Sequence, residues 1–233
     1  MTAISKVGRV ARLAVLVTGW AAAMTFAHAA DVAAPVVKVG DTWVYHAIDG
    51  YRQKRTWDET HEVIAINADG ITVRVTTQGG GADTTRTEVW ASPGVIRVGA
   101  IAENETDRFD PPLIRYKFPM TSGTTWSQRL RNLDQPPGPY GGISYKATAR
   151  SREKVTTPAG TFDAFRIRYV IQLDDESLTQ NPTQADYLVW YAPAVGAMVK
   201  AEKKSYTTLK GSASPRVPGQ NSVYTLTSFK RGP

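Results

Sequence analysis

The feature that most constrains this chain is an alternation of apolar and polar side chains with a period of two residues. In FRIRYVIQL (165–173) every second residue from Phe165 is apolar or aromatic, and Arg166 and Arg168 fall between them. A β-strand places successive side chains on opposite faces, so the pattern predicts a strand with one buried face. The segments ITVRVTT (71–77) and IRYKF (114–118) show the same alternation.

In the segment 114–118 the alternation sets Ile114, Tyr116 and Phe118 on the buried face and Arg115 and Lys117 on the polar face. Further strands are expected at 42–48, 60–67, 84–90, 144–152, 186–191, 197–207 and 222–230. The intervening segments, such as NADG and PPGPYGG, are rich in Gly and Pro and predict turns.

No segment after the first thirty residues carries a sustained apolar stripe of helical period. The sequence therefore predicts an all-β fold, with short helices conceivable only at DESLTQNPTQ (175–184) and ENETDRF (103–109). About 200 residues are enough for a single β domain.

One hairpin can be predicted in more detail, in YLVWYAPAVGAMVKAE (187–202). The first run has apolar residues on both faces, and Trp190 and Tyr191 end it. Pro193 cannot donate a backbone hydrogen bond and Gly196 can adopt a left-handed conformation, so we expect a tight turn between two antiparallel strands.

The first residues have the layout of a secretory leader. Lys6, Arg9 and Arg12 precede an apolar run that ends at Phe26, and AHA (27–29) offers small residues at the cleavage positions. The apolar run is shorter than the ~20 residues of a membrane-spanning helix. We therefore expect a signal peptide at 1–29, removed after Ala29, a single β domain at 30–233 with no transmembrane segment, and a periplasmic or secreted location.

Removal of this leader changes the charge balance. The full chain has 28 basic and 21 acidic side chains, a net charge of +7, and the leader contains three of the basic residues and none of the acidic ones. The remaining +4 is ordinary for a domain of this size, and its basic residues are scattered, so we predict no nucleic-acid partner. The chain has no cysteine, which excludes disulfides, thiolate metal ligands and a lipid anchor on cysteine.

Two segments carry a resemblance to known proteins: VTTPAGTFDAFRIRY (155–169) and YLVWYAPAVGAMVKAE (187–202). They resemble an uncharacterised group of exported bacterial β-proteins with PAGTF and WYAPxVG motifs. The resemblance implies a highly curved antiparallel sheet that forms an incomplete barrel, similar to the lipoprotein carriers of the LolA and LolB type, which hold acyl chains on a concave face. No catalytic residues follow from it.

Candidates for chemistry are few. His46 and His61 could converge with Asp58 or Glu62, but we interpret both as surface histidines on strands and predict no metal site and no cofactor. The acidic run DDES (174–177) lacks the alternating ligands and the glycine of a calcium loop, so we expect Asp174 or Asp175 to pair with nearby arginines. No sequence motif of a nucleophile or of a phosphate loop is present, so we predict no catalytic residue and no enzymatic activity.

The remaining candidates are aromatic and apolar side chains on the strands. Most are expected to fill the core, but an open concave face would bind an apolar ligand. The leading hypothesis is a non-catalytic protein that binds a hydrophobic small molecule, an acyl chain or a lipidated partner; the alternatives are an adaptor for an envelope protein and, last, a hydrolase. The candidate ligand-binding residues are Trp43, Tyr45, Tyr116, Phe118, Trp126, Phe165, Ile167, Tyr169 and Trp190.

Overall fold

The computed structural model describes residues 2, 31–52, 55–81, 83–101, 106–135, 141–175, 181–211 and 216–233. The expected leader at 1–29 lies outside these residues except for Thr2. Within them the all-β prediction is confirmed: the chain forms strands and no helix, and hence no helix long and apolar enough to cross a membrane. The described parts of 103–109 and 175–184 contribute to strands and to irregular segments rather than to helices.

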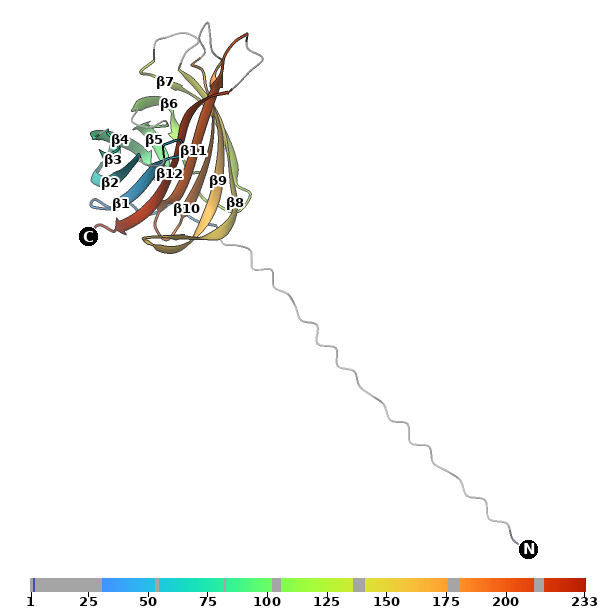
Figure 1. Cartoon of the computed structure of the whole chain (residues 1–233). Helices are drawn as coiled ribbons and strands as arrows, with labels where there is room; N and C mark the ends of the chain where they lie inside the picture. The colour runs from blue at the N-terminus through green and yellow to red at the C-terminus, as the bar shows by residue number, and fades with distance from the viewer. Residues whose placement is uncertain are drawn as a thin grey trace.

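Twelve antiparallel strands follow one another along the described chain (Figure 1). They are β1 (Thr42–Asp49), β2 (Thr56–Asn67), β3 (Gly70–Gly79), β4 (Thr84–Ser92), β5 (Val95–Gly99), β6 (Asp107–Ile114), β7 (Thr125–Asn132), β8 (Gly142–Thr157), β9 (Gly160–Leu173), β10 (Thr183–Ala192), β11 (Ala197–Thr208) and β12 (Arg216–Lys230).

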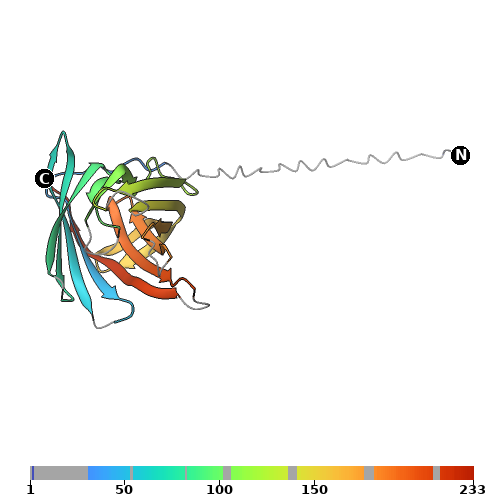
Figure 2. The same ribbon diagram turned by 90° about the horizontal axis from the view of Figure 1, so that it is seen from above.

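Each strand pairs with its neighbours in sequence, and β12 returns to pair with β1. This last pairing runs from Thr42 opposite Lys230 to Asp49 opposite Ser222. The expectation of an incomplete barrel is therefore wrong, because the sheet curves far enough for its first and last strands to meet. Figure 2 shows the curved wall from above.

The period of two is the reason that one face of this wall is buried. On β9, Ile167 is fully buried and Tyr169 is 7% exposed. Val170, the next residue along the strand, lies on the outer face and is 51% exposed. The predicted hairpin is also present: β10 ends at Ala192, β11 begins at Ala197, and Gly196 in the turn has a φ of 72°.

The barrel is held most weakly between β6 and β7. These strands pair only through Phe109 with Asn132 and Asp110 with Arg131. The next two residues of β6, Pro111 and Pro112, have no backbone N–H to donate, so the ladder cannot continue.

Side chains replace the missing ladder. The amide of Gln128 donates to the carbonyl oxygen of Pro112 at 2.8 Å, and its oxygen accepts the N–H of Ile114 at 3.0 Å. The carbonyl oxygen of Ile114 accepts the indole N–H of Trp126 at 2.9 Å and the hydroxyl of Tyr145 at 2.7 Å. The wall is thus completed by three side chains where main-chain pairing stops.

The strand expected at 114–118 is wrong beyond its first residue, where β6 ends. Arg115 leaves the predicted polar face and extends its guanidinium to the buried carboxylate of Glu88, 3.4 Å away. The N–H of Tyr116 donates to Gly94 in the turn between β4 and β5, 3.0 Å away. An interior ion pair and a turn contact therefore draw this segment into the barrel and outweigh its alternating pattern.

The segment before β1 packs across one end of the barrel and is tied to the end of the chain. The fully buried carboxylate of Asp41 accepts hydrogen bonds from the backbone N–H of Lys38 at 3.0 Å and of Gly232 at 2.8 Å. The guanidinium of Arg231 reaches the same carboxylate at 3.2 Å. This arrangement places Pro35 at the interior cavity.

Candidate functional site

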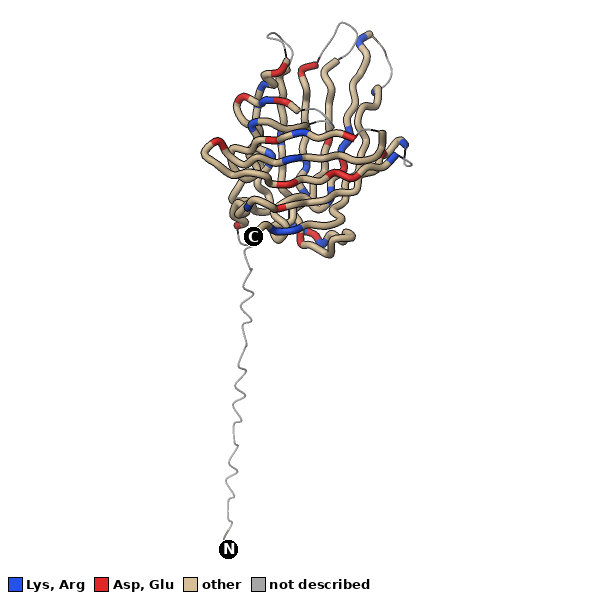
Figure 3. The backbone as a smooth tube through the Cα atoms, turned by 90° about the vertical axis from the view of Figure 1, so that its left-hand side faces the viewer, with Lys and Arg blue, Asp and Glu red and all other residues tan. Residues whose placement is uncertain are grey.

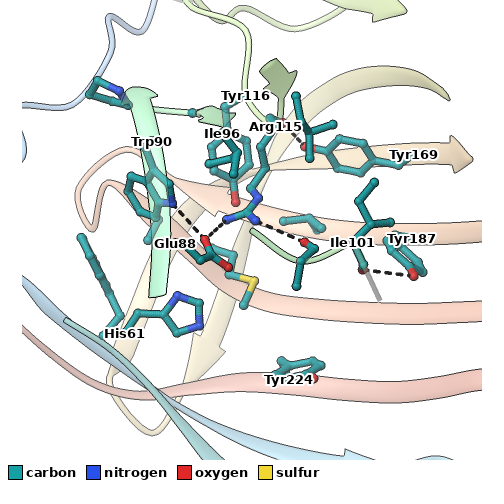
Figure 4. Close-up of a pocket in the computed structure, with 18 of the residues that line it drawn as sticks. His61, Glu88, Trp90, Ile96, Ile101, Arg115, Tyr116, Tyr169, Tyr187 and Tyr224 are labelled. Atoms are coloured by element: carbon teal, nitrogen blue, oxygen red, sulfur yellow. Dashed lines mark hydrogen bonds and ion pairs between the residues drawn. The ribbon is translucent and has the colours of Figure 1, made fainter. Parts of the chain in front are cut away.

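The interior of the barrel contains a cavity of about 140 Å³. Side chains from most of the strands reach it, together with the segment before β1 and the segment after β6 (Figure 4). Its aromatic lining residues are Trp43, Tyr45, Trp90, Tyr116, Phe118, Tyr145, Tyr169, Tyr187 and Tyr224. Its ionisable lining residues other than tyrosine are Glu59, His61, Arg86, Glu88, Arg115 and Lys203.

Glu59 and Arg86 form the first half of a buried charged cluster. Glu59 on β2 accepts a hydrogen bond from Nε2 of His61 at 2.6 Å and from the guanidinium of Arg86 on β4 at 3.3 Å. The side chains of Glu59, His61 and Arg86 are 9%, 11% and 12% exposed. Arg86 also lies 3.8 Å from Glu88, so it links two interior carboxylates.

Glu88 is the centre of the second half. Its side chain is 1% exposed and accepts the indole N–H of Trp90 at 2.9 Å. Arg115 lies 3.4 Å from the same oxygen and donates from its other Nη to the carbonyl oxygen of Ala100 at 3.4 Å. Figure 4 shows the guanidinium of Arg115 directed toward Glu88.

The cluster keeps both carboxylates ionised. Burial acts to raise the pKa of Glu59, but the hydrogen bond from His61 and the charges of His61 and Arg86 outweigh it, so the pKa is well below its usual range. Burial likewise opposes ionisation of Glu88, and the charge of Arg115 with the other partners holds its pKa below the usual value. The same contacts keep Arg115 charged. Burial acts to lower its pKa, but the carboxylate of Glu88 outweighs burial, so the pKa lies above its usual value.

Aromatic rings complete the wall around the cluster. The ring of Tyr45 meets that of His61 edge-on at 5.3 Å, and the ring of Tyr116 lies 4.7 Å from that of Tyr191. Burial raises the pKa of Tyr116 to about 12, against a smaller opposing effect of Arg115. The phenol is therefore a hydrogen-bond donor at neutral pH. The cavity combines apolar surface with a small number of polar groups, as small-molecule sites do.

The structure separates the nine predicted ligand-binding residues into three sets. Those that line the cavity are Trp43, Tyr45, Tyr116, Phe118 and Tyr169. Three more are buried in the core without lining it: Trp126, Phe165 and Ile167. Trp190 lies on the outer face, where its indole donates to Glu153 and the ammonium of Lys200 is 4.6 Å from its ring.

The two histidines lie on opposite faces of the wall. His46 is exposed on β1 and contacts Asp58 at 2.8 Å, as expected of a surface histidine. For His61 the surface interpretation is wrong, because the pairing of Trp43 with His61 places both on the inside. No group of three or more potential metal ligands occurs within the described ranges.

The charged cluster itself was missed by sequence reasoning. Arg86 and Glu88 lie two residues apart in a strand whose apolar residues do not alternate cleanly, so no face could be assigned to them. Glu59 and His61 have the same spacing on β2. Pairs of opposite charge at this spacing on strands were the available signal, but the same spacing is common on solvated faces.

The outer surface has a mixed character. Lys and Arg are interspersed with Asp and Glu over the strands (Figure 3). Arg168 pairs with Asp186 and Arg74 with Glu62, and Arg129 lies 3.4 Å from Asp174, which confirms the pairing predicted for the acidic run. The expectation that nucleic acid is not a partner stays a prediction.

Comparison with known proteins finds a family match over part of the chain. Residues 146–210 match the family described as DUF3108-like. This segment runs from β8 to the end of β11 and contains both motifs, PAGTF and WYAPAVG, on which the resemblance rests. No curated protein matches the chain.

Two solved structures have similar overall shapes. One is described as a "putative lipoprotein" from Parabacteroides distasonis; it is 14% identical, with a TM-score of 0.49, and the match covers 86% of this chain and 100% of that one. The other is a "putative exported protein with YmcC-like fold" from Bacteroides fragilis; it is 14% identical, with a TM-score of 0.48, and the match covers 87% of this chain and 100% of that one.

Proposed function

We propose that this protein binds a hydrophobic small molecule inside its barrel and catalyses no reaction. The observation that carries the proposal is the interior cavity of about 140 Å³ surrounded by aromatic side chains. A fully packed core would leave no such space, because protein interiors are close-packed and voids larger than a water molecule are few. A periplasmic or secreted location is part of the proposal and rests on the expected leader at 1–29.

The volume limits the ligand. Pockets for drug-sized molecules have volumes of about 300–1,000 Å³, so a long acyl chain requires the walls of this cavity to move. A ligand of one ring or a short chain fits the cavity as it stands. The acyl group of a lipidated partner would require the same movement of the cavity walls.

The adaptor alternative depends on an unpaired strand edge. Every strand in the described part of the chain has two neighbours. Unpaired backbone groups for a partner protein are therefore available only where the main-chain pairing of β6 with β7 ends. There the backbone carbonyl oxygens of β6 already accept hydrogen bonds from the side chains of Gln128, Trp126 and Tyr145. Ligand binding is therefore the stronger proposal.

The test uses the purified protein with two probes, 4-fluorotoluene followed by ¹⁹F NMR and dodecanoate followed by calorimetry. Mass spectrometry of a solvent extract reports any compound that co-purifies. Val189 lines the cavity and Val170 is exposed on the outside of the adjacent strand. Val189→Phe should fill the cavity and weaken binding of 4-fluorotoluene at least about tenfold, whereas Val170→Phe should leave it unchanged.

Melting curves of both variants separate lost binding from lost folding. The proposal is overturned if neither probe binds and the extract contains no compound in stoichiometric amount. It is also overturned if Val189→Phe folds and binds as the unmodified protein does, because binding would then lie elsewhere.

A further inference from the structure

We infer that the segment before β1 is a lid: residues 31–37, here called the strap, move away from the end of the barrel and open the interior cavity to solvent. A ligand enters and leaves under the strap, and for the ligand the inference rests on the proposed function. The opening itself can be tested without a ligand. Three observations lead to the inference: what the strap covers, how few contacts hold it, and how firmly its neighbours are held.

The strap forms part of the cavity wall. Pro35 and Val37 line the cavity, and Val32 packs against the buried core. Pro35 lies against the turn between β10 and β11, where a Cβ added to Gly196 would be 3.2 Å from the Cβ of Pro35. Val36, between the two lining residues, is 80% exposed. Displacement of the strap therefore removes two residues from the wall and exposes the cavity at this end of the barrel.

Few hydrogen bonds hold the strap in place. Val32 pairs with Met120, and the N–H of each donates to the carbonyl oxygen of the other, at 2.9 and 2.8 Å. Residues 33–37 make no hydrogen bond to another described residue. Opening therefore costs two backbone hydrogen bonds and the partial burial of three apolar side chains. Segments with so few contacts open locally, without unfolding of the whole protein.

The residues that follow the strap are fixed. The N–H of Lys38 donates to the buried carboxylate of Asp41 at 3.0 Å, and its ammonium donates to the carbonyl oxygen of Pro233 at 3.3 Å. The N–H of Gly40 donates to the carbonyl oxygen of Val63 at 2.8 Å. The movement is therefore confined to the residues before Lys38.

Residues 115–120 also line the cavity and pair with the strap, but they are held more firmly. The guanidinium of Arg115 reaches Glu88 at 3.4 Å, and the carbonyl oxygen of Arg115 accepts the hydroxyl of Tyr169. The N–H of Tyr116 donates to the carbonyl oxygen of Gly94 at 3.0 Å. Three parts of the barrel thus hold this segment, whereas the strap is hydrogen-bonded at one residue. The strap is the part that opens.

The first test measures access to the cavity without a ligand. The chain has no cysteine, so Val189→Cys introduces a single thiol on the cavity wall, and mass spectrometry follows its modification by methyl methanethiosulfonate. Val32→Asp adds a charge at a partly buried position of the strap and should make the modification at least about tenfold faster. Val36→Asp adds the same charge at an exposed position and should leave the rate within about twofold.

A second thiol separates opening of the strap from unfolding of the barrel. Val73 is fully buried on β3 and does not line the cavity, so the thiol of Val73→Cys reacts only when the barrel unfolds. Because local opening is more frequent than global unfolding, the thiol at position 189 should react at least about a hundredfold faster. Equal rates at the two positions overturn the inference. A rate at position 189 that Val32→Asp does not change overturns it as well.

A disulfide can hold the strap closed. Val32 and Met120 exchange both backbone hydrogen bonds, and in such pairs the Cα atoms lie about 5.5 Å apart, a separation that suits a disulfide. Neither residue lines the cavity. In the double variant Val32→Cys and Met120→Cys, ¹⁹F exchange spectroscopy gives the rate constants for entry and release of 4-fluorotoluene. Oxidation should lower both at least about tenfold and leave the Kd within about twofold of the reduced form, which is the control.

The outcomes separate this inference from the proposed function. If 4-fluorotoluene exchanges equally fast in the oxidised and reduced forms, the ligand enters elsewhere, so the inference is wrong and the proposed function stands. A Kd that changes as much as the rate constants also overturns the inference, because the disulfide then alters the cavity and not its entrance. If no probe binds while the thiol at position 189 responds to Val32→Asp as expected, the proposed function fails and the strap still opens the cavity.

Discussion

The inside of the barrel has two unlike walls. β9 and β10 present apolar and aromatic side chains, such as Ile167 and Val189, whereas β2 and β4 present Glu59, Arg86 and Glu88. The first wall is what hydrophobic burial alone would produce. On the second wall, at least four charged or polar groups lose their hydration on folding. The attraction within buried ion pairs rarely offsets that loss, so such pairs add little net stability. Hydrophobic burial therefore explains the first wall, whereas a contribution to stability alone does not explain the second.

The largest effect is expected from breaking the polar wall. Arg86→Met removes the cation that links Glu59 at 3.3 Å to Glu88 at 3.8 Å and leaves both carboxylates buried with fewer partners. We expect the free energy of unfolding to fall by about 3–5 kcal/mol, the usual cost of removing one partner of a buried pair. Urea denaturation of the purified variant measures it.

Arg168→Met is the matched control. Arg168 pairs with Asp186 on the outer face, where both side chains are more than 40% exposed. Exposed pairs contribute about 0–1 kcal/mol, so this variant should remain close to the unmodified protein. If both substitutions have the same cost, the interior cluster is solvated and the distinction between the two walls disappears.

A smaller effect is expected from the apolar wall. Ile167→Ala creates a void in a fully buried position of β9, and we expect a loss of about 3 kcal/mol. Val170→Ala on the exposed face of the same strand should change the free energy of unfolding by less than about 0.5 kcal/mol. A loss at Val170 as large as that at Ile167 would mean that the outer face of β9 is buried in solution.

These two walls also differ in how well the sequence predicts them. On β9 the alternation of apolar and polar residues is complete, so strand, face and buried residues follow from the period of two. The PAVG turn between β10 and β11 follows equally from the chemistry of proline and glycine. Closure of the barrel does not follow, because the pairing of β12 with β1 depends on the accumulated curvature of twelve strands and not on a local pattern.

On the polar wall the local pattern misleads. A charged residue on a strand is normally assigned to the solvent, and this rule placed His61 and Arg115 outside. Both are inside because each meets a buried carboxylate there: Glu59, two residues away on the same strand, for His61, and Glu88 on β4 for Arg115. For Arg115 the compensation depends on which segments lie side by side in the barrel, which the sequence alone does not reveal. Tyr116 and Phe118, in contrast, were predicted correctly as cavity residues, although the strand expected at 114–118 ends at Ile114. Aromatic side chains tend toward the interior whether the backbone is a strand or a loop.

The smallest effect is expected from acid. The pKa values of Glu59 and Glu88 are both lower in the folded protein than the usual value of 4.5. A carboxyl with a lowered pKa stabilises the fold above its unfolded pKa, and the stabilisation is lost as the pH falls below that value. Between pH 6 and pH 4 we therefore expect these two groups to account for about 1–2 kcal/mol of the decrease in the free energy of unfolding.

Urea denaturation at pH 6, 5 and 4 measures this decrease, and the double variant Glu59→Gln and Glu88→Gln should show a shallower slope by that amount. Glu62→Gln with Asp186→Asn removes two carboxylates from the outer face, where both are more than 40% exposed, and should keep most of the slope. If the outer variant flattens the slope and the inner one does not, the acid sensitivity belongs to the surface. The interior carboxylates would then gain no stabilisation from their charged partners, and the polar wall would be no more than a solvated lining of the barrel.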